Sequence, residues 1–230
     1  LKTNDLSESQ TSALNELKNH LNDKDVILLE GVTSSGKTEI YIKIIEDYLD
    51  KNMQVLYLLP EISLTTQIIQ KLKIHFGNKI SVFHSRYSLN ERTEVWENIK
   101  NNNDKSKLVV GARSSVFLPF KNLGLIIVDE EHEISYKQQE PSPRYNARDS
   151  AIYLSKINNS KVILGSATPS IESSFNAKKA KYGYVKLNER FGNIEMPNIF
   201  TIDMKNELKH NYSSIFSIKL VEEIDKTIKE

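Results

Sequence analysis

Cysteine is absent from the 230 residues, which excludes disulfide bonds and thiolate zinc sites within them and is compatible with a cytoplasmic protein. No apolar run approaches the roughly 18–20 residues of a membrane span, and the first residues carry no signal-peptide pattern, so no membrane partner is expected. Basic and acidic residues nearly balance, 31 against 30, so any surface that attracts a polyanion must be local. The chain also begins without methionine, and we expect it to be an excised piece of a longer protein.

A glycine-rich turn follows the first apolar segment. Residues 31–38 read GVTSSGKT, which fits the phosphate-loop pattern G-x-x-x-x-G-K-[ST], after an apolar run at 26–30 and before a stretch of helical periodicity. In such a loop backbone N–H groups close around phosphate, Lys37 supplies a cation, and Thr38 offers a hydroxyl to Mg²⁺. The alternative is a glycine turn that only begins a helix. The context favours a nucleotide site formed by Gly31, Thr33, Ser34, Ser35, Gly36, Lys37 and Thr38.

A second polar motif, Asp129-Glu130-Glu131-His132, follows the apolar residues 124–128. At the end of a buried strand, one carboxylate can hold Mg²⁺ through water, and the next can orient and deprotonate an attacking water molecule. Three successive acids could instead form only a solvated loop. Paired with the phosphate loop, the motif predicts a site in which Asp129 holds the metal and Glu130 acts as the base.

Strand-like and helix-like segments alternate, which predicts an α/β fold with a mostly parallel sheet and helices on both faces. A capping-box spacing at Ser88 and Glu91 predicts the start of one helix, and Gly77 is a suitable end for another. Beyond about residue 186 the pattern weakens. The expected strands are 26–30, 54–59, 80–83, 108–111, 125–129, 162–165 and 198–202, and the expected helices include 37–51, 63–76, one from 88 through 99, and an amphipathic segment at 218–228.

Five segments in order resemble motifs I, Ia, Ib, II and III of superfamily 2 helicases: residues 31–38, 58–65, 110–117, 129–132 and 165–169. The text between them, including SYKQ at 135–138 and PRYNARD at 143–149, resembles the PriA family of replication-restart helicases over roughly residues 6–205. The resemblance implies a RecA-like P-loop NTPase lobe at 1–205, with 206–230 a linker and the start of a second helicase lobe. The rest of that lobe with its arginine finger, and the family's N-terminal DNA-binding and zinc-binding regions, are absent from these residues.

The resemblance also implies residue roles. Lys37 and Thr38 would hold triphosphate and Mg²⁺, Asp129 would bind the metal, and Glu130 would activate water. Gln10 matches the glutamine that reads adenine, although a lone glutamine is more often an ordinary surface residue. The residues that would couple nucleotide state to movement are His132, Ser166 and Thr168. His132 could equally be a plain loop histidine, and Thr168 before Pro169 could be a helix cap.

A loop at residues 136–148 interleaves aromatic, cationic and proline residues beside the acids, a mixture that suits unpaired bases and their phosphates. In PriA and RecQ-like helicases the corresponding aromatic-rich loop senses DNA. The alternative for this loop is a polar loop with half-buried tyrosines. Arg113, outside the loop, could contact a DNA phosphate or could form a buried ion pair. The residues expected to contact DNA are Pro60, Thr65, Arg113, Tyr136, Lys137, Arg144, Tyr145 and Arg148.

The resemblance, together with these motifs, implies the ATP-binding lobe of a DNA helicase that uses ATP and Mg²⁺ at stalled replication forks, with 3′ to 5′ polarity by resemblance alone. The resemblance implies DNA, primosome proteins and single-strand-binding proteins as partners, together with the absent lobe and N-terminal region. A complete site needs the second lobe, so the chain alone is expected to be nearly inactive. The alternatives are another superfamily 2 DNA translocase and a nucleotide-binding module that is inactive in isolation. A GTPase is disfavoured, since no N-K-x-D guanine signature is present.

Overall fold

The computed structural model describes residues 6–61, 66–84, 87–190, 198–209 and 214–229. They form two compact units, Leu1–Asn193 and Ile194–Glu230. The first unit ends at Asn193, whereas the sequence suggested that the lobe ends at residue 205. The boundary at 205 stays a prediction.

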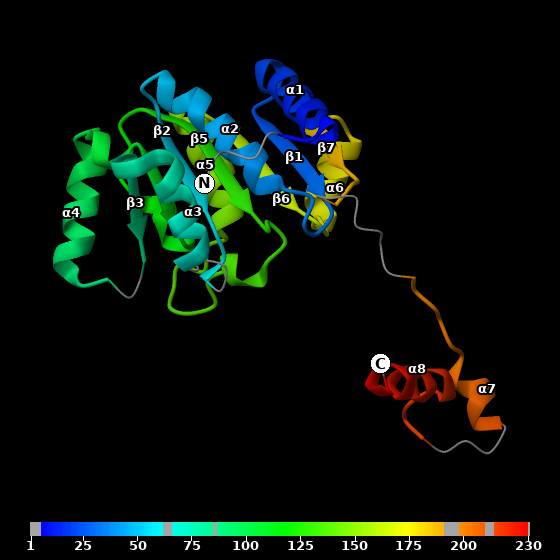
Figure 1. Ribbon diagram of the computed structural model, residues 1–230. Helices are drawn as coiled ribbons and strands as arrows, with labels where there is room; N and C mark the ends of the chain where they lie inside the picture. The colour runs from blue at the N-terminus through cyan, green and yellow to red at the C-terminus, as the bar shows by residue number, and fades with distance from the viewer. Residues whose placement is uncertain (1–5, 62–65, 85–86, 191–197, 210–213, 230) are drawn as a thin grey trace. The chain divides into compact units, whose positions relative to one another are not determined.

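The first unit contains a seven-stranded sheet in which every neighbouring pair of strands is parallel (Figure 1). The strand order is β3-β4-β2-β5-β6-β1-β7. The predicted α/β fold with a parallel sheet is therefore confirmed. The strands are β1 (Val26–Gly31), β2 (Gln54–Leu58), β3 (Ile80–Phe83), β4 (Leu108–Gly111), β5 (Leu123–Asp129), β6 (Lys161–Ser166) and β7 (Gly183–Leu187).

Helices cover both faces of this sheet, because the apolar residues of each central strand alternate between two cores. Ile27 and Leu29 of β1 join the core under α1, α2 and α3, whereas Val26 and Leu28 join the core under α4 and α5. The helices of this unit are α1 (Glu8–Asp23), α2 (Lys37–Asp50), α3 (Thr66–Phe76), α4 (Leu89–Lys100), α5 (Ala147–Asn158) and α6 (Ile171–Lys178), with 3-10 helices η4 (Arg113–Phe117) and η5 (Ile134–Tyr136) between strands and helices.

Local sequence signals set several boundaries. Ser88 and Glu91 form the predicted capping box of α4, and Gly77 follows α3 with a left-handed φ of 55°. The predicted start of α3 at residue 63 lies outside the described residues. The prediction of a strand at 198–202 is wrong, since these residues have no regular secondary structure. In its place the seventh strand is β7, an edge strand with alternating burial.

The second unit contains α7 (Met204–Lys209) and α8 (Ile218–Lys229). The amphipathic segment expected at 218–228 is confirmed as a helix, and its apolar side chains are exposed. No helix within the described residues is both long enough and apolar enough to cross a membrane.

The register of the parallel strands places the carboxyl ends of the central strands side by side, along one end of the sheet. Asp129 of β5 lies opposite Gly165 of β6, and Glu30 of β1 lies opposite Ser166. Because ligands of parallel α/β sheets bind beyond these strand ends, this end of the sheet is where a site is expected.

Candidate functional site

The phosphate loop joins β1 to α2 and closes tightly. Gly36, the N-cap of α2, has a left-handed φ of 83°, and a Cβ there would collide with the Nε2 atom of Gln10. Lys37 is buried, and its Nζ donates to the carbonyl oxygen of Gly31 at 2.9 Å. The cation that the motif provides for phosphate therefore bonds to the loop itself in this structure.

A cavity of about 450 Å³ opens beside this loop. Two observations show that it fits phosphate. The Oγ atom of Ser35 is buried without a hydrogen-bond partner among the described residues, and Gly36 offers no side chain to cap the first turn of α2. The cavity is lined by Thr33, Ser34, Ser35, Gly36, Lys37, Thr38, Glu39, Lys71, Asp129 and Glu130.

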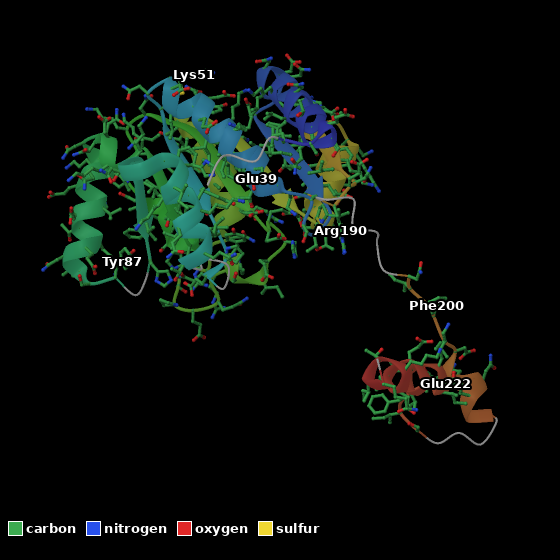
Figure 2. The ribbon with its side chains drawn as sticks, in the orientation of Figure 1. Glu39, Lys51, Tyr87, Arg190, Phe200 and Glu222 are labelled. Carbon is green, nitrogen blue, oxygen red and sulfur yellow. The ribbon has the colours of Figure 1, made fainter. Side chains whose placement is uncertain are left out.

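Two charged residues of this lining, Lys71 and Glu39, were not predicted from the sequence. Glu39, labelled in Figure 2, lies on the first turn of α2, and its carboxylate pairs with Lys71 of α3 at 2.6 Å. The pair adds one cation and one carboxylate to the lining of the cavity. The periodicity of α3 gave no reason to separate Lys71 from other exposed lysines.

Asp129 ends β5 between two tyrosine hydroxyl groups. Tyr41 donates to Oδ1 at 3.2 Å and Tyr57 donates to Oδ2 at 3.1 Å. Burial of the carboxyl group, together with the nearby negative charge of Glu130, raises the pKa of Asp129 to about 6, although Lys37 and the two hydroxyls act in the opposite direction. The Asp129 carboxylate and Thr38 both line the cavity, and they offer oxygen donors of the kind that Mg²⁺ binds.

The rings of both tyrosines lie in the core. Their role in holding Asp129 was missed, because they come from α2 and β2, far from Asp129 in sequence. Burial raises the pKa of both hydroxyls well above the ordinary value, so both remain protonated donors. Gly165 lies where any side chain would collide with the Tyr41 hydroxyl, which explains glycine at that position.

Glu130 has a left-handed backbone, with φ of 49°, which is uncommon outside glycine, asparagine and aspartate. Its carboxylate lies 3.9 Å from Nζ of Lys37 and 3.7 Å from Nδ1 of His132. The structure thus brings together Lys37, Asp129 and Glu130, the three residues predicted to be catalytic.

The three residues predicted to couple the motifs also converge. Nδ1 of His132 lies 2.7 Å from Oγ of Ser166, and Nε2 lies 3.4 Å from Oγ1 of Thr168. Thr168 is not a helix cap, since α6 begins after Ser170, whose side chain accepts from the Ser173 N–H group. His132 therefore bridges the acid motif and the segment after β6.

Gln10 is only 1% exposed, which differs from an ordinary surface glutamine. Its Oε1 accepts from the Ser7 N–H group at 3.0 Å, and its Nε2 donates to the carbonyl oxygen of Ser35 at 3.0 Å. The side chain thus ties the start of α1 to the phosphate loop. One N–H of its amide is left for a ligand.

Some residues predicted to contact DNA are unavailable in this structure. The Tyr136 side chain is 1% exposed, and its hydroxyl donates to the carbonyl oxygens of Asp129 and Leu58. The prediction that this ring contacts DNA is therefore wrong. Pro60 is also buried, which contradicts its predicted contact. Arg148 is mostly buried and pairs with Glu131 at 3.1 Å rather than projecting outward. Thr65 lies outside the described residues.

Other members of the set remain accessible. Lys137 and Arg144 are exposed, and the Lys137 ammonium donates to the Arg144 carbonyl oxygen at 2.6 Å. Arg113 donates to the Ser135 carbonyl oxygen at 3.1 Å and forms no ion pair with any other described residue. Tyr145 is half-buried, and its ring meets that of Phe117 edge to face, with centroids 4.7 Å apart.

Phe117 itself was not predicted, although it is 62% exposed at the end of η4. Its position in the motif Ib-like segment was the available signal. We name the accessible residues Arg113, Phe117, Lys137, Arg144 and Tyr145 the aromatic surface.

The sheet, the phosphate loop and the acids at the strand ends define the nucleotide-binding lobe of a P-loop NTPase. Residues 7–175 match the family model described as DEAD/DEAH box helicase. The chain belongs to this helicase family.

Its sequence is also similar to curated relatives. It is 43% identical over 225 residues to the replication restart protein PriA of Bacillus subtilis, covering 97% of this chain and 28% of that protein. It is 46% identical over 220 residues to the replication restart protein PriA of Rickettsia felis, covering 96% of this chain and 33% of that one. The predicted resemblance is confirmed, and the chain spans about a third or less of the length of these relatives.

Solved helicases share the fold. RecG bound to a three-way DNA junction superposes with a TM-score of 0.59 at 21% identity, covering 90% of this chain and 27% of that one. The DUF1998 helicase MrfA bound to DNA gives a TM-score of 0.57 at 18% identity, covering 80% and 27% respectively. These likenesses extend to the arrangement of strands and helices.

Proposed function

We propose that this lobe binds and hydrolyses ATP to drive movement of a larger helicase along DNA during replication restart. The observation that supports it best is the convergence of Lys37, Asp129 and Glu130 on one cavity beside an unpartnered Ser35 hydroxyl. The similarity to PriA supports the cellular role.

Each of these side chains has a distinct task in the proposal. Lys37 leaves the Gly31 carbonyl and pairs with the β and γ phosphate oxygens. Thr38 and Asp129 would hold Mg²⁺, which when bound neutralises charge on those oxygens. Glu130 orients the attacking water and accepts its proton. His132 relays the position of Glu130 to Ser166 and Thr168.

Gln10 orients the base of the nucleotide in this proposal. Its Nε2 already lies against the phosphate loop, and the free N–H of the amide can donate to a ring nitrogen of adenine. Oε1 already accepts from the Ser7 N–H group and has a second lone pair that can accept from the amino group of adenine.

The aromatic surface is proposed to contact single-stranded DNA. The exposed Phe117 ring offers a stacking face for a base, and Tyr145 supports it from the side. Arg144 and Lys137 carry positive charge beside these rings, which suits the phosphate backbone.

We infer the remaining features from similarity to longer relatives. They are residues 206–230 as a linker and the start of a second lobe that supplies an arginine finger, an N-terminal DNA-binding region, 3′ to 5′ polarity, primosome and single-strand-binding partners, and cytoplasmic location. Since half of the nucleotide site would belong to the second lobe, this chain alone is expected to hydrolyse ATP very slowly. An arginine finger contributes about 10³–10⁵ in rate.

The test compares this chain with a protein in which it is joined to the second helicase lobe, here called the two-lobe protein. ATP hydrolysis is measured with and without single-stranded DNA, for the unmodified protein and for Lys37→Ala. Lys51→Ala, at the exposed far end of α2, is the matched control. We expect DNA-stimulated hydrolysis that only Lys37→Ala abolishes.

Two outcomes would contradict the proposal. Hydrolysis by the chain alone at the rate of a complete helicase, lost in Lys37→Ala, would show that no second lobe is needed. A two-lobe protein that binds nucleotide without turnover would instead indicate a binding module.

A further inference from the structure

Glu131, the third acid of the motif, has no direct access to the nucleotide cavity. Its side chain is buried, and its carboxylate accepts from four donor groups. These are the Ser170 N–H at 2.7 Å, the Ser170 hydroxyl at 3.0 Å, the Ser173 hydroxyl at 2.9 Å and Nη1 of Arg148 at 3.1 Å. Glu131 therefore joins the acid motif to the start of α6 and to α5.

Arg148 connects this carboxylate to the loop that carries part of the aromatic surface. The loop closes through a bridge between Lys137 and Asn146 and a hydrogen bond from the Gln138 N–H to the Tyr145 carbonyl oxygen at 2.9 Å. Asn146 then caps α5 by accepting from the Arg148 N–H at 2.9 Å. Asn146, which closes the loop, is two residues before Arg148 and bonded to it, so a displacement of the loop would also displace Arg148.

Glu131 in turn fixes the residue proposed as the base. Its N–H donates to the Gly165 carbonyl oxygen at 3.0 Å, directly beside Glu130, whose left-handed φ of 49° is maintained only if its neighbours hold it. Both the backbone and the side chain of Glu131 are anchored. Glu131 is therefore placed to influence the position of Glu130, the residue before it.

The ion pair can open without leaving either charge unpartnered. Glu131 keeps its three donors from Ser170 and Ser173, and Arg148 keeps its 2.9 Å contact with Asp149. A fully buried pair with no other partners would be too costly to break in each catalytic cycle.

We propose that the ion pair between Arg148 and Glu131 transmits the position of the aromatic loop to Glu130, so that Arg148 acts as a positioning residue and not as a phosphate contact. The proposal rests on the DNA-stimulated hydrolysis proposed above. It assigns Glu131 a role in coupling that is separate from metal binding and proton transfer.

The experiment uses the two-lobe protein with Arg148→Lys, Arg148→Met and Glu131→Gln, each alone and with the last two combined. Arg148→Lys keeps the charge but loses the planar fork that reaches several acceptors at once. Lys156→Met, an exposed cation further along α5, is the control. The readouts are the ratio of hydrolysis with saturating single-stranded DNA to hydrolysis without it, the DNA affinity at several salt concentrations, and the melting temperature.

We expect the stimulation ratio to fall in all three single variants by about 5–150-fold, the usual range of coupling between sites. DNA affinity and its salt dependence should match the unmodified protein, and the double variant should lose no more than either single variant. The control should keep its ratio.

Other results would overturn the inference. If Arg148→Lys keeps stimulation while Arg148→Met lowers the salt dependence by about one phosphate contact, Arg148 binds DNA directly. If the melting temperature falls but the ratio holds, the ion pair only stabilises the fold. If the unmodified protein shows no stimulation, the proposed function fails rather than this link.

Discussion

Substitution of Asp129 by asparagine should make the folded chain more stable at alkaline pH while it damages the metal site. The carboxylate lies against Tyr41, Tyr57 and Glu130, and asparagine has nearly the same shape without the charge. Its amide can still accept from one tyrosine hydroxyl and donate to the other oxygen. The substitution therefore removes a disfavoured buried charge with little change in packing.

The magnitude follows from the pKa of Asp129, which burial and the Glu130 charge raise from 3.8 to about 6. A folded-state pKa above the unfolded value stabilises the fold at low pH, and this contribution is lost as pH rises through about 6. At about 1.4 kcal/mol per pKa unit, the full loss is about 3 kcal/mol, of which roughly half develops between pH 5 and pH 8. Asn cannot titrate, so Asp129→Asn avoids this loss.

Thermal unfolding of the ligand-free chain at pH 5 and pH 8 measures the effect. The melting-temperature advantage of Asp129→Asn should grow by about 3–6 °C between the two conditions. Asp23→Asn, which removes an exposed carboxylate at the end of α1, controls for net charge. An advantage that does not change with pH, or a variant that is less stable at pH 8, would refute the reasoning. The same variant should bind nucleotide with weaker dependence on Mg²⁺.

Three further predictions concern the site and the aromatic surface. In the two-lobe protein, Glu130→Gln should bind nucleotide but lose turnover, because the amide cannot accept a proton; normal hydrolysis would place the base elsewhere. Phe117→Ala should weaken single-stranded DNA affinity by about 1–3 kcal/mol in fluorescence anisotropy at fixed salt; unchanged affinity would exclude stacking by this ring. Calorimetry should show Mg²⁺-dependent nucleotide affinity falling as pH drops through about 6, where Asp129 becomes protonated, and equal affinity at pH 5 and pH 8 would contradict this.

The central strands could be predicted from sequence because burial on both faces makes each one a continuous apolar run. Of these, β4 has the predicted ends, and β1, β2, β5 and β6 differ by one or two residues. The edge strand β3 also has the predicted ends. The edge strand β7 was missed because its residues alternate between exposed and buried, as in Tyr184, Val185 and Lys186, and no long apolar run marks it. At 198–202 apolar residues were mistaken for a strand, although Ile199 and Phe200 are exposed.

The site could be predicted where chemistry depends on short spacing, and not where it depends on contacts between distant segments. The phosphate loop and the acids are each contiguous, so Lys37 and the acidic run could be named from sequence. The position of Glu130 after Asp129 gave its predicted role, but the partners of Glu131 could not be predicted, because Arg148 and Ser170 come from other elements. Tyr136 was predicted to stack on DNA bases because the loop at 136–148 is rich in aromatic and cationic residues. The burial of its ring depends on distant segments and could not be predicted from that composition.

The free lobe already satisfies most of the polar groups that a nucleotide would need. Lys37 bonds to Gly31 and lies near Glu130, and Gln10 uses Oε1 on Ser7. A nucleotide would share or displace these contacts, and only the surplus over them contributes to its affinity. The unpartnered Ser35 hydroxyl is the exception, since it gains a contact without losing one. We therefore expect the strongest new contact with a nucleotide to form at the phosphate loop.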